Sequence, residues 1–541
     1  MRLRILLVVL VAGIPALCDA TPLDDYVAAA DPTYSYTVHS AEAREGYSQY
    51  SVKLVSQTWR GASEVDHPEW WHWLSVAVPD VFASDICLLV IEGEENNHPD
   101  APAADEIVEY LGLAASLMGL PVAYLKQVPN QPLQFADEDH DRTEDGIIAY
   151  SFDKYLATGD PTWPVLLPMA KSAVRAMDTI QDLIVAEHTQ EIPEFIVAGA
   201  SKRGWTTWLT AAVDARVVGI VPIVIDVLNM SEQVRHHREA YGFYANAVHD
   251  YADMNIFDRV DTPEGGALRA IVDPYSYRDR FTMPKLVVTA TGDQFFPCDS
   301  AQFYFADLPG PKNLRVFPNM GHGMEFDTDM IPAMVNVVYH IMEGTPMPAY
   351  DWQVLENNVL HVEVSGEVQA VRLWQATNPD TRDFRDGVVG DVWTATPLEP
   401  EAKKRRPTVI AGKPCRFRGT TRRRNETIVD RRGSCLISPE GAAAISRGRA
   451  KRAHGCAPEN TEEPRRGDRK TGRFLKSVAK QSANEEQTSS LFPTRQAAAS
   501  CSFRPTRCSA SPRPVSSMRP RRHTGRRCAE RSLRCAARGW T

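Results

Sequence analysis

A strand-like apolar stretch that runs into a glycine and a serine, at residues 195–205, constrains the fold of this chain most strongly. Phe195 to Ala198 predict a buried strand, the chain breaks at Gly199, and a helix-compatible segment opens after Ser201. This is the layout of a nucleophile elbow, which holds a serine hydroxyl clear of the sheet edge. The alternative interpretation is an ordinary tight turn of a doubly wound sheet, in which the serine only caps the helix.

The match to the elbow motif is irregular in one position. The usual pattern places its second glycine two residues after the serine, where this chain has Arg203, and Gly204 comes one residue later. We therefore expect the contact between the helix and the strand to differ from the usual one.

Two further apolar stretches end in polar residues, in the order that a hydrolase triad requires. Residues 285–293 predict a buried strand that ends in Gly-Asp293, and residues 314–323 predict another that ends in Gly-His322-Gly. Both residues follow strand C-terminal ends, the edge at which open α/β sheets place their chemistry. The sequence thus predicts Ser201 as nucleophile, His322 as base and Asp293 as the acid that orients the histidine.

Other acids compete for the third role. Asp226 closes the strand over residues 219–225, and Asp299 lies shortly after Asp293. We prefer Asp293 because the Thr-Gly-Asp turn presents it directly at a strand end.

An oxyanion hole needs two backbone N–H groups, one of them after an earlier strand. The N–H of Lys202, at the start of the helix, is the first expected donor. Residues 86–91 predict that earlier strand, and the second expected donor is an N–H near Gly93 or Glu94. An ordinary acidic loop is the alternative interpretation of residues 92–97.

Strand-like and helix-like segments alternate through the body of the chain, which predicts a mostly parallel sheet with helices on both faces. Residues 228–277 break the alternation and are rich in aromatic residues and histidines, so we expect a cap over the serine. The spacing of His236, His237 and His249 fits no zinc pattern, and neither a phosphate-binding loop nor a dinucleotide fingerprint is found. The sequence therefore predicts no metal and no cofactor.

The two ends of the chain differ from its body. Residues 1–20 have two arginines, a short apolar run and small residues, as in a secretory signal peptide, so an extracellular protein without stable membrane insertion is expected. Residues 21–348 form the expected α/β body, and residues 349–400 a small β-rich part. Its three or four predicted strands fall short of the ~7 strands of a β-sandwich.

Residues 401–541 are expected to be a disordered basic tail. After residue 401 lie 35 of the 60 basic residues, with few large aliphatic side chains to form a core. The tail is either a basic arm for polyanions or an artefact of the gene model. The body is acidic, which argues against nucleic acid as its partner. It contains only Cys87 and Cys298, so it does not depend on a disulfide framework.

Several longer segments resemble the PhoPQ-activated pathogenicity-related protein family, which includes secreted autocrine proliferation repressors. The resemblance covers about residues 22–396 and is carried by residues 56–60, 71–74, 127–133, 144–150, 198–205, 221–226, 273–278 and 289–296. It implies a secreted α/β-hydrolase-like domain followed by a small β-rich domain. The family tends to be glycine-rich after the first catalytic-sheet strand, whereas this chain has Glu92, Glu94 and Glu95 there.

Two functions are consistent with these features. One is a secreted serine hydrolase that cleaves an ester or peptide bond of a small molecule or peptide. The capped, exported architecture slightly favours short peptides as its substrates. The other is a secreted signalling or binding protein that keeps the scaffold without turnover and acts on a cell-surface receptor.

Overall fold

The computed structural model describes most of the body of the chain and short parts of its C-terminal region. The described residues are 20–100, 106–324, 330–354, 360–365, 370–379, 381–398, 408–410, 434–439 and 443–445. The expected signal peptide, apart from its last residue, lies outside these ranges, as does most of the expected tail. Within the described ranges, no helix combines the length and the hydropathy needed to cross a membrane.

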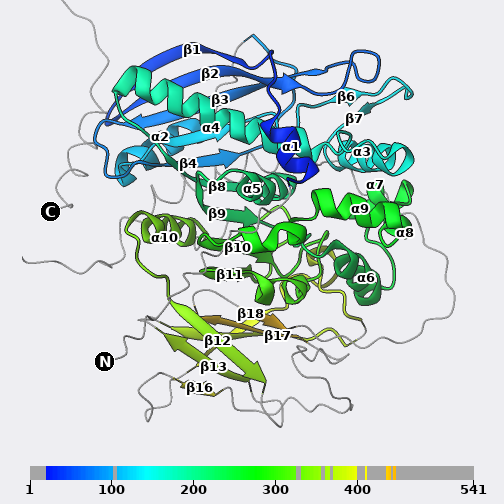
Figure 1. Cartoon of the computed structure of the whole chain (residues 1–541). Coiled ribbons are helices and arrows are strands. Elements are labelled where there is room, and N and C mark those ends of the chain that lie inside the picture. Colours follow the sequence, from blue (N-terminus) through cyan, green and yellow to red (C-terminus); the bar gives the residue numbers. More distant parts are fainter. Residues whose placement is uncertain are drawn as a thin grey trace, which may run out of the picture. The chain divides into compact units, whose positions relative to one another are not determined.

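One large sheet organises the body (Figure 1). From β5 to β11 its neighbouring strands are parallel, whereas β1, β2 and β3 pair antiparallel with one another, and β3 pairs antiparallel with β5. In spatial order the strands are β1 (Ser35–Arg44), β2 (Tyr47–Thr58), β3 (Glu69–Pro79), β5 (Val122–Leu125), β4 (Ile86–Ile91), β8 (Glu194–Ala200), β9 (Val217–Ile223), β10 (Lys285–Ala290) and β11 (Lys312–Phe317).

The central strands are mostly apolar, as expected for a sheet that is covered by helices on both faces. Successive side chains of a strand point to opposite faces, so Phe195 and Val197 pack in one core while Ile196 and Ala198 pack in the other. The first core includes side chains of α4 (Leu166–His188) and α5 (Lys202–Val213), and the second those of α2 (Glu106–Met118) and α10 (Met330–Met342). The predicted α/β-hydrolase-like fold is thus confirmed.

Short helices fill the chain between β9 and β10, where the sequence predicts a cap. Figure 1 shows them gathered at one end of the strands, beside α3 (Asp145–Thr158). These elements are α6 (Met230–Tyr241), η1 (Asn246–Val248), α7 (His249–Asp253), α8 (Ile256–Arg259), α9 (Pro263–Val272) and η2 (Pro274–Arg280). Short elements elsewhere in the body are α1 (Pro22–Ala28), β6 (Leu133–Gln134), β7 (Asp141–Arg142), η3 (Ser300–Phe303) and η4 (Phe305–Asp307).

The β-rich part downstream consists of two small antiparallel sheets. One has the order β12 (Ala349–Val354), β13 (Leu360–Ser365) and β16 (Thr408–Ile410), and the other has β15 (Thr394–Leu398), β14 (Val371–Ala376), β17 (Ser434–Pro439) and β18 (Ala443–Ile445). Three of these strands, β16, β17 and β18, lie beyond residue 400, within the stretch for which the sequence predicts disorder. They pair with strands of the β-rich part, and such pairing partners cannot be identified from local composition.

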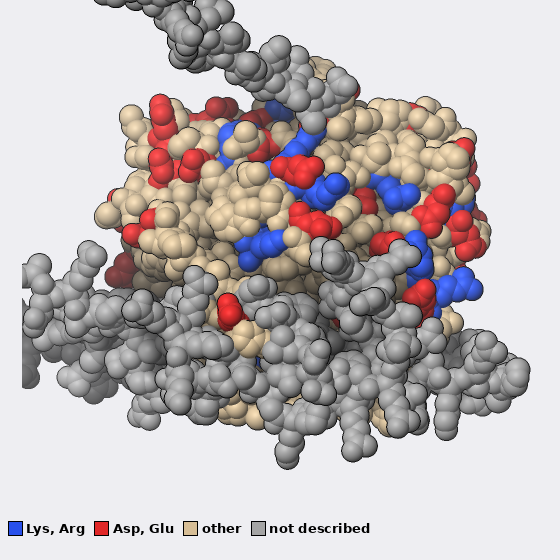
Figure 2. Space-filling view, turned by 60° about the horizontal axis from the view of Figure 1, so that its bottom comes forward, with Lys and Arg blue, Asp and Glu red and all other residues tan. Residues whose placement is uncertain are grey.

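Charged side chains of both signs occur on the surface. On the face drawn in Figure 2, acidic and basic side chains of the described residues are interspersed.

Candidate active site

Ser201 occupies the sharp turn between β8 and α5. Its backbone angles are φ 56° and ψ −128°, a conformation that residues other than glycine rarely adopt and that costs about 1–3 kcal/mol. The turn is held by a hydrogen bond from the Ser201 N–H to the Ile223 carbonyl, with an N···O distance of 2.8 Å. A strained serine at a strand–helix junction is the geometry of a nucleophile elbow.

Glycines on both sides of the serine explain the irregular motif. A Cβ atom added to Gly204 would lie 2.7 Å from Ile225 Cγ2 and 2.8 Å from the Gly199 carbonyl oxygen. A Cβ atom on Gly199 would lie 2.6 Å from the Arg203 carbonyl oxygen. The close helix–strand contact therefore needs its second glycine at position 204, and position 203 is free to carry a long side chain.

The structure brings Ser201, His322 and Asp293 together. His322 Nε2 lies 2.8 Å from Ser201 Oγ, and His322 Nδ1 lies 2.8 Å from Asp293 Oδ2. With the Nδ1 proton donated to the carboxylate, Nε2 of the neutral ring can accept the serine proton. Turns after β8, β10 and β11 thus converge, as the sequence predicts.

Asp293 is itself held in place by its own turn. It is 1% exposed, and its Oδ1 atom accepts hydrogen bonds from the Phe295 and Phe296 N–H groups at 2.7 and 3.2 Å. The next residue, Gln294, accepts the backbone N–H of His322 with its Oε1 atom at 2.9 Å. The acid turn therefore orients both the ring and the backbone of the histidine.

Neither competing acid is bonded to His322. Asp226 accepts hydrogen bonds from the Tyr304 and Thr289 hydroxyl groups, and burial raises its pKa to about 6 despite them. Asp299 pairs with His236 and Arg382. Burial alone would raise the pKa of Asp299, but its interactions with His236 and Arg382 lower it to about 2. Both carboxylates thus have other buried partners.

The two expected oxyanion donors differ in their availability. The Lys202 N–H begins α5, where the first N–H groups have no acceptor within the helix. The Gly93 N–H donates to Oε1 of Glu92 at 2.8 Å, and Gly93 also packs against the Arg203 guanidinium. In this structure the Glu92 carboxyl group thus takes the N–H of Gly93, one of the two expected second donors, and Glu94 is the other expected donor.

Sequence reasoning missed a buried ion-pair network directly behind the serine. Arg203 makes a bidentate pair with Glu144, at 2.7 and 2.5 Å, and also donates to the Val128 carbonyl at 2.6 Å. Lys202 Nζ lies 2.6 Å from Glu144 Oε2 and 3.0 Å from Asp145 Oδ2. All four ionic side chains are mostly buried, and two cations face two anions.

The electrostatics of this network keep it charged. Burial by itself would raise the pKa of Glu144, but Arg203 and Lys202 hold it well below its usual range. Burial would likewise lower the pKa of Lys202, but Asp145 and Glu144 raise it above its usual range. The only signal in the sequence is an acidic pair at the start of a helix, which does not reveal partners more than 50 residues away.

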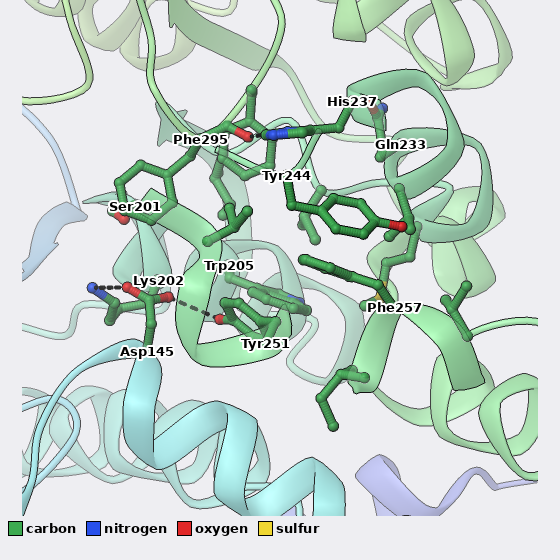
Figure 3. A pocket seen from close by; sticks show the side chains of 18 of the residues that line it. Asp145, Ser201, Lys202, Trp205, Gln233, His237, Tyr244, Tyr251, Phe257 and Phe295 are labelled. Carbon is green, nitrogen blue, oxygen red and sulfur yellow. Dashed lines mark hydrogen bonds and ion pairs between the residues drawn. The ribbon is translucent and has the colours of Figure 1, made fainter. Parts of the chain in front are cut away.

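A pocket of about 90 Å³ opens beside Ser201 (Figure 3). Lys202, Asp145 and Trp205 line it, and half of its other lining residues come from α6, η1, α7 and α8. The segment predicted as a cap therefore lines this pocket.

A segment of the downstream part contacts the turns that carry the triad. The Asp386 N–H donates to the Gly292 carbonyl at 2.9 Å, next to Asp293. Near His322, the Asn319 side chain bonds the backbone of Trp393 at both its N–H and its carbonyl, at 2.8 and 3.0 Å. Residues 382–393 thus support the acid turn and the histidine turn from outside the sheet.

Known proteins resemble this chain at the level of sequence over most of its body. A family described as "PhoPQ-activated pathogenicity-related protein" matches residues 23–385. The chain belongs to that family. This confirms the resemblance found in the sequence, and the PhoPQ-related match includes the serine, the acid and the histidine described above.

One relative of this chain is the autocrine proliferation repressor protein A of Dictyostelium discoideum. It is 36% identical over 397 residues, which cover 70% of this chain and 79% of the relative.

Among solved structures, this PhoPQ-related chain matches two acetyl xylan esterases. The enzyme from Thermoanaerobacterium shares 16% identity at a TM-score of 0.41, and the match covers 59% of this chain and 91% of the esterase. The enzyme from Paenibacillus shares 14% identity at a TM-score of 0.42, with 60% and 92% covered.

Proposed function

We propose that the protein is a secreted serine hydrolase that cleaves an ester or peptide bond through Ser201, His322 and Asp293. The observation that carries the proposal is the hydrogen-bonded chain from Asp293 through His322 to Ser201. Burial of Asp293 and the strained backbone of Ser201 support it, because both are features of a prepared nucleophile.

The reaction follows from these contacts. Ser201 Oγ bonds to the carbonyl carbon of the substrate while its proton moves to His322 Nε2, and the carbonyl oxygen becomes an oxyanion. The Lys202 N–H stabilises this oxyanion. The bond to the leaving group then breaks, and His322 returns its proton to that group. A water molecule next gives one proton to His322, attacks the acyl carbon, and releases the acid as the serine recovers its proton.

The test is covalent labelling with a small fluorophosphonate, which reacts with activated serines. We expect the full-length protein to be labelled and the Ser201→Ala variant not to be. Equal labelling of both proteins would reject the proposal. Recovery of the protein from culture medium, with a mature N-terminus near residue 21, would test secretion separately.

A second candidate is a secreted signalling or binding protein without turnover. It is favoured by the name of the Dictyostelium relative, a proliferation repressor, and by the engaged Gly93 N–H, which leaves the second oxyanion donor unassigned. If the His322→Ala variant retained a full effect on cell proliferation while labelling was lost, this candidate would be preferred.

A further inference from the structure

We propose that the pocket beside Ser201 selects uncharged, apolar acyl groups of several carbons, either aromatic or branched aliphatic. In a peptide, this group would be the side chain of the residue that supplies the scissile carbonyl. The inference rests on the proposed function, since it names the substrate class of the same site.

The position of the pocket indicates which side of the substrate it holds. Ser201 and Lys202 line it, and these residues would carry the nucleophile and the first oxyanion donor. His322 is not among its lining residues, although the leaving group must lie against His322 Nε2 to receive a proton. The pocket is therefore on the acyl side of the scissile bond.

The lining of the pocket is mostly apolar, apart from Ser201, Asp145, Lys202, Gln233 and His237. Figure 3 shows aromatic rings of Trp205, Tyr244, Tyr251 and Phe257 around it, with Phe295 beside the serine. Some of these rings pack on one another: Tyr244 and Phe257 have ring centroids 4.4 Å apart, and Tyr251 and Phe257 5.9 Å. Aliphatic side chains complete the lining, namely Ile225, Val227, Met230, Val234, Val248, Ile256 and Val260.

The charged groups in the lining are neutralised by the protein itself. Lys202 lies between Glu144 and Asp145, and Asp145 also accepts a hydrogen bond from the Tyr251 hydroxyl group at 2.8 Å. His237 is held neutral, because burial lowers its pKa to about 4, and both of its ring nitrogens are hydrogen-bonded. A negatively charged acyl group would therefore lose its hydration here, because the lining cation, Lys202, is already paired with Glu144 and Asp145.

The size of the pocket excludes a very small acyl group as the best fit. A cavity whose volume is measured in the same way needs roughly 10–15 Å³ to hold one water molecule. The pocket of about 90 Å³ therefore accommodates several heavy atoms. The methyl group of an acetyl ester would leave most of it unfilled. Each CH₂ group buried in the transition state is expected to raise kcat/KM about fourfold, until the pocket is full.

A series of p-nitrophenyl esters tests the inference, with the full-length protein and the acetate, butyrate, hexanoate, phenylacetate and hemisuccinate esters. We expect kcat/KM to rise at least about tenfold from acetate to hexanoate or phenylacetate. The negatively charged hemisuccinate should react more slowly than butyrate. Equal or higher kcat/KM for acetate or hemisuccinate would overturn the inference.

A pocket-filling variant locates the effect. Val234 lines the pocket from α6 and is only partly buried, so a Val234→Phe side chain has room to enter the pocket rather than the core. We expect the ratio of kcat/KM for phenylacetate to that for acetate to fall about tenfold. Val185→Phe, at a 49% exposed position of α4, is the matched control and should leave this ratio unchanged. An unchanged ratio in a folded Val234→Phe protein would also overturn the inference.

Fluorophosphonate labelling of Ser201 separates the two possible failures. If Ser201 is labelled but the acyl preference is absent, only the substrate class is wrong. If Ser201 is not labelled and no ester is hydrolysed, the proposed function and this inference are rejected together.

Discussion

Arg203 and Glu144 form a buried bidentate ion pair directly behind the serine turn, with N···O distances of 2.7 and 2.5 Å. Glu144 begins α3 with φ 53° and ψ −125°, nearly the same strained conformation as Ser201 at the start of α5. Gln131 holds both the backbone and the side chain of Glu144. Two strained turns are thus linked through one ion pair, which restrains Arg203, two residues after the nucleophile.

Replacing Glu144 should lower the free energy of unfolding of the protein. Glu144→Gln leaves the Arg203 and Lys202 charges buried with one carboxylate fewer, and breaking such a pair costs about 3–5 kcal/mol. The measurement is the free energy of unfolding in urea, followed by tryptophan fluorescence. Glu232→Gln removes a half-exposed partner of Arg235 and serves as the control, with an expected loss below about 1 kcal/mol. Similar losses in both variants would contradict a structural role for the buried pair.

Gly204→Ala should damage the serine turn. The added methyl group would lie within 3 Å of the Gly199 carbonyl oxygen and of Ile225, and such overpacking costs about 1–3 kcal/mol. Thermal unfolding and fluorophosphonate labelling measure the effect. Gly266→Ala in α9 is the matched control, because its nearest neighbour would be 3.8 Å away, and it should be neutral or slightly stabilising. A wild-type labelling rate for Gly204→Ala would show that the turn tolerates the methyl group.

Asp293→Asn should abolish most turnover while the protein remains folded. The amide group cannot stabilise the charged imidazole and favours the wrong tautomer, an effect worth about 10⁴-fold in kcat in a comparable triad. Ester hydrolysis gives the rate, and circular dichroism checks the fold. The exposed Asp279→Asn variant is the control and should keep the wild-type rate. A loss of less than tenfold in Asp293→Asn would argue that another acid orients His322.

His237 should make stability depend on pH. Its Nδ1 atom lies 3.2 Å from the Phe295 carbonyl oxygen, and its Nε2 atom accepts the Ala245 N–H, so the ring must be neutral. Burial lowers its pKa to about 4, aided by the nearby Arg385 guanidinium and opposed by the hydrogen bond to the Phe295 carbonyl and, less strongly, by Asp293.

The sign of this effect follows from proton binding. Between pH ~6.5, the ordinary histidine value, and pH ~4, the unfolded chain binds a proton at this position and the folded protein does not. The contribution of His237 to stability is therefore complete above pH ~6.5 and is lost as the pH falls, by up to about 1.4 kcal/mol per pH unit. Urea unfolding from pH 4.5 to 7.5 should show a shallower loss in His237→Gln than in wild type; parallel curves would refute it.

Arg385 should restrain the end of α6 in the cap. Its guanidinium lies over the rings of Tyr241 and Phe243, 5.0 and 5.3 Å from their centroids, and it pairs with Asp383. Removing the cation in Arg385→Gln should cost about 0.5–1 kcal/mol of local stability, so hydrogen exchange near Tyr241 should accelerate about two- to fivefold. Arg372→Gln, at an exposed position of β14, should leave the exchange unchanged.

Much of the candidate site could be predicted because its residues are marked locally. Ser201, Asp293 and His322 each end an apolar strand with a small-residue turn, and parallel strands present such turns at one edge of the sheet. The cap could be predicted in the same way, as the segment in which the alternation of strands and helices stops.

Other parts of the site cannot be recognised from the residues that surround them in the sequence. Arg203 and Glu144 meet across 59 positions of the chain, and neither residue is unusual in its own segment. Gly93 is small enough for its backbone N–H to approach an oxyanion, but this N–H donates to the adjacent Glu92 carboxyl group instead. The strands beyond residue 400 are short segments in a basic stretch, and only their pairing partners make them strands.

The sequence by itself determined the strands that carry the serine, the acid and the histidine, the turns that follow these strands, and the order in which the three residues occur. These features depend on burial and turn chemistry within a few residues, and periodicity records both. Only the tertiary structure decided which charges are paired, which N–H groups are free and what lines the pocket. Those outcomes depend on atoms from distant segments of the chain. Which donor pairs with which acceptor is decided only when the folded chain brings the competing groups together.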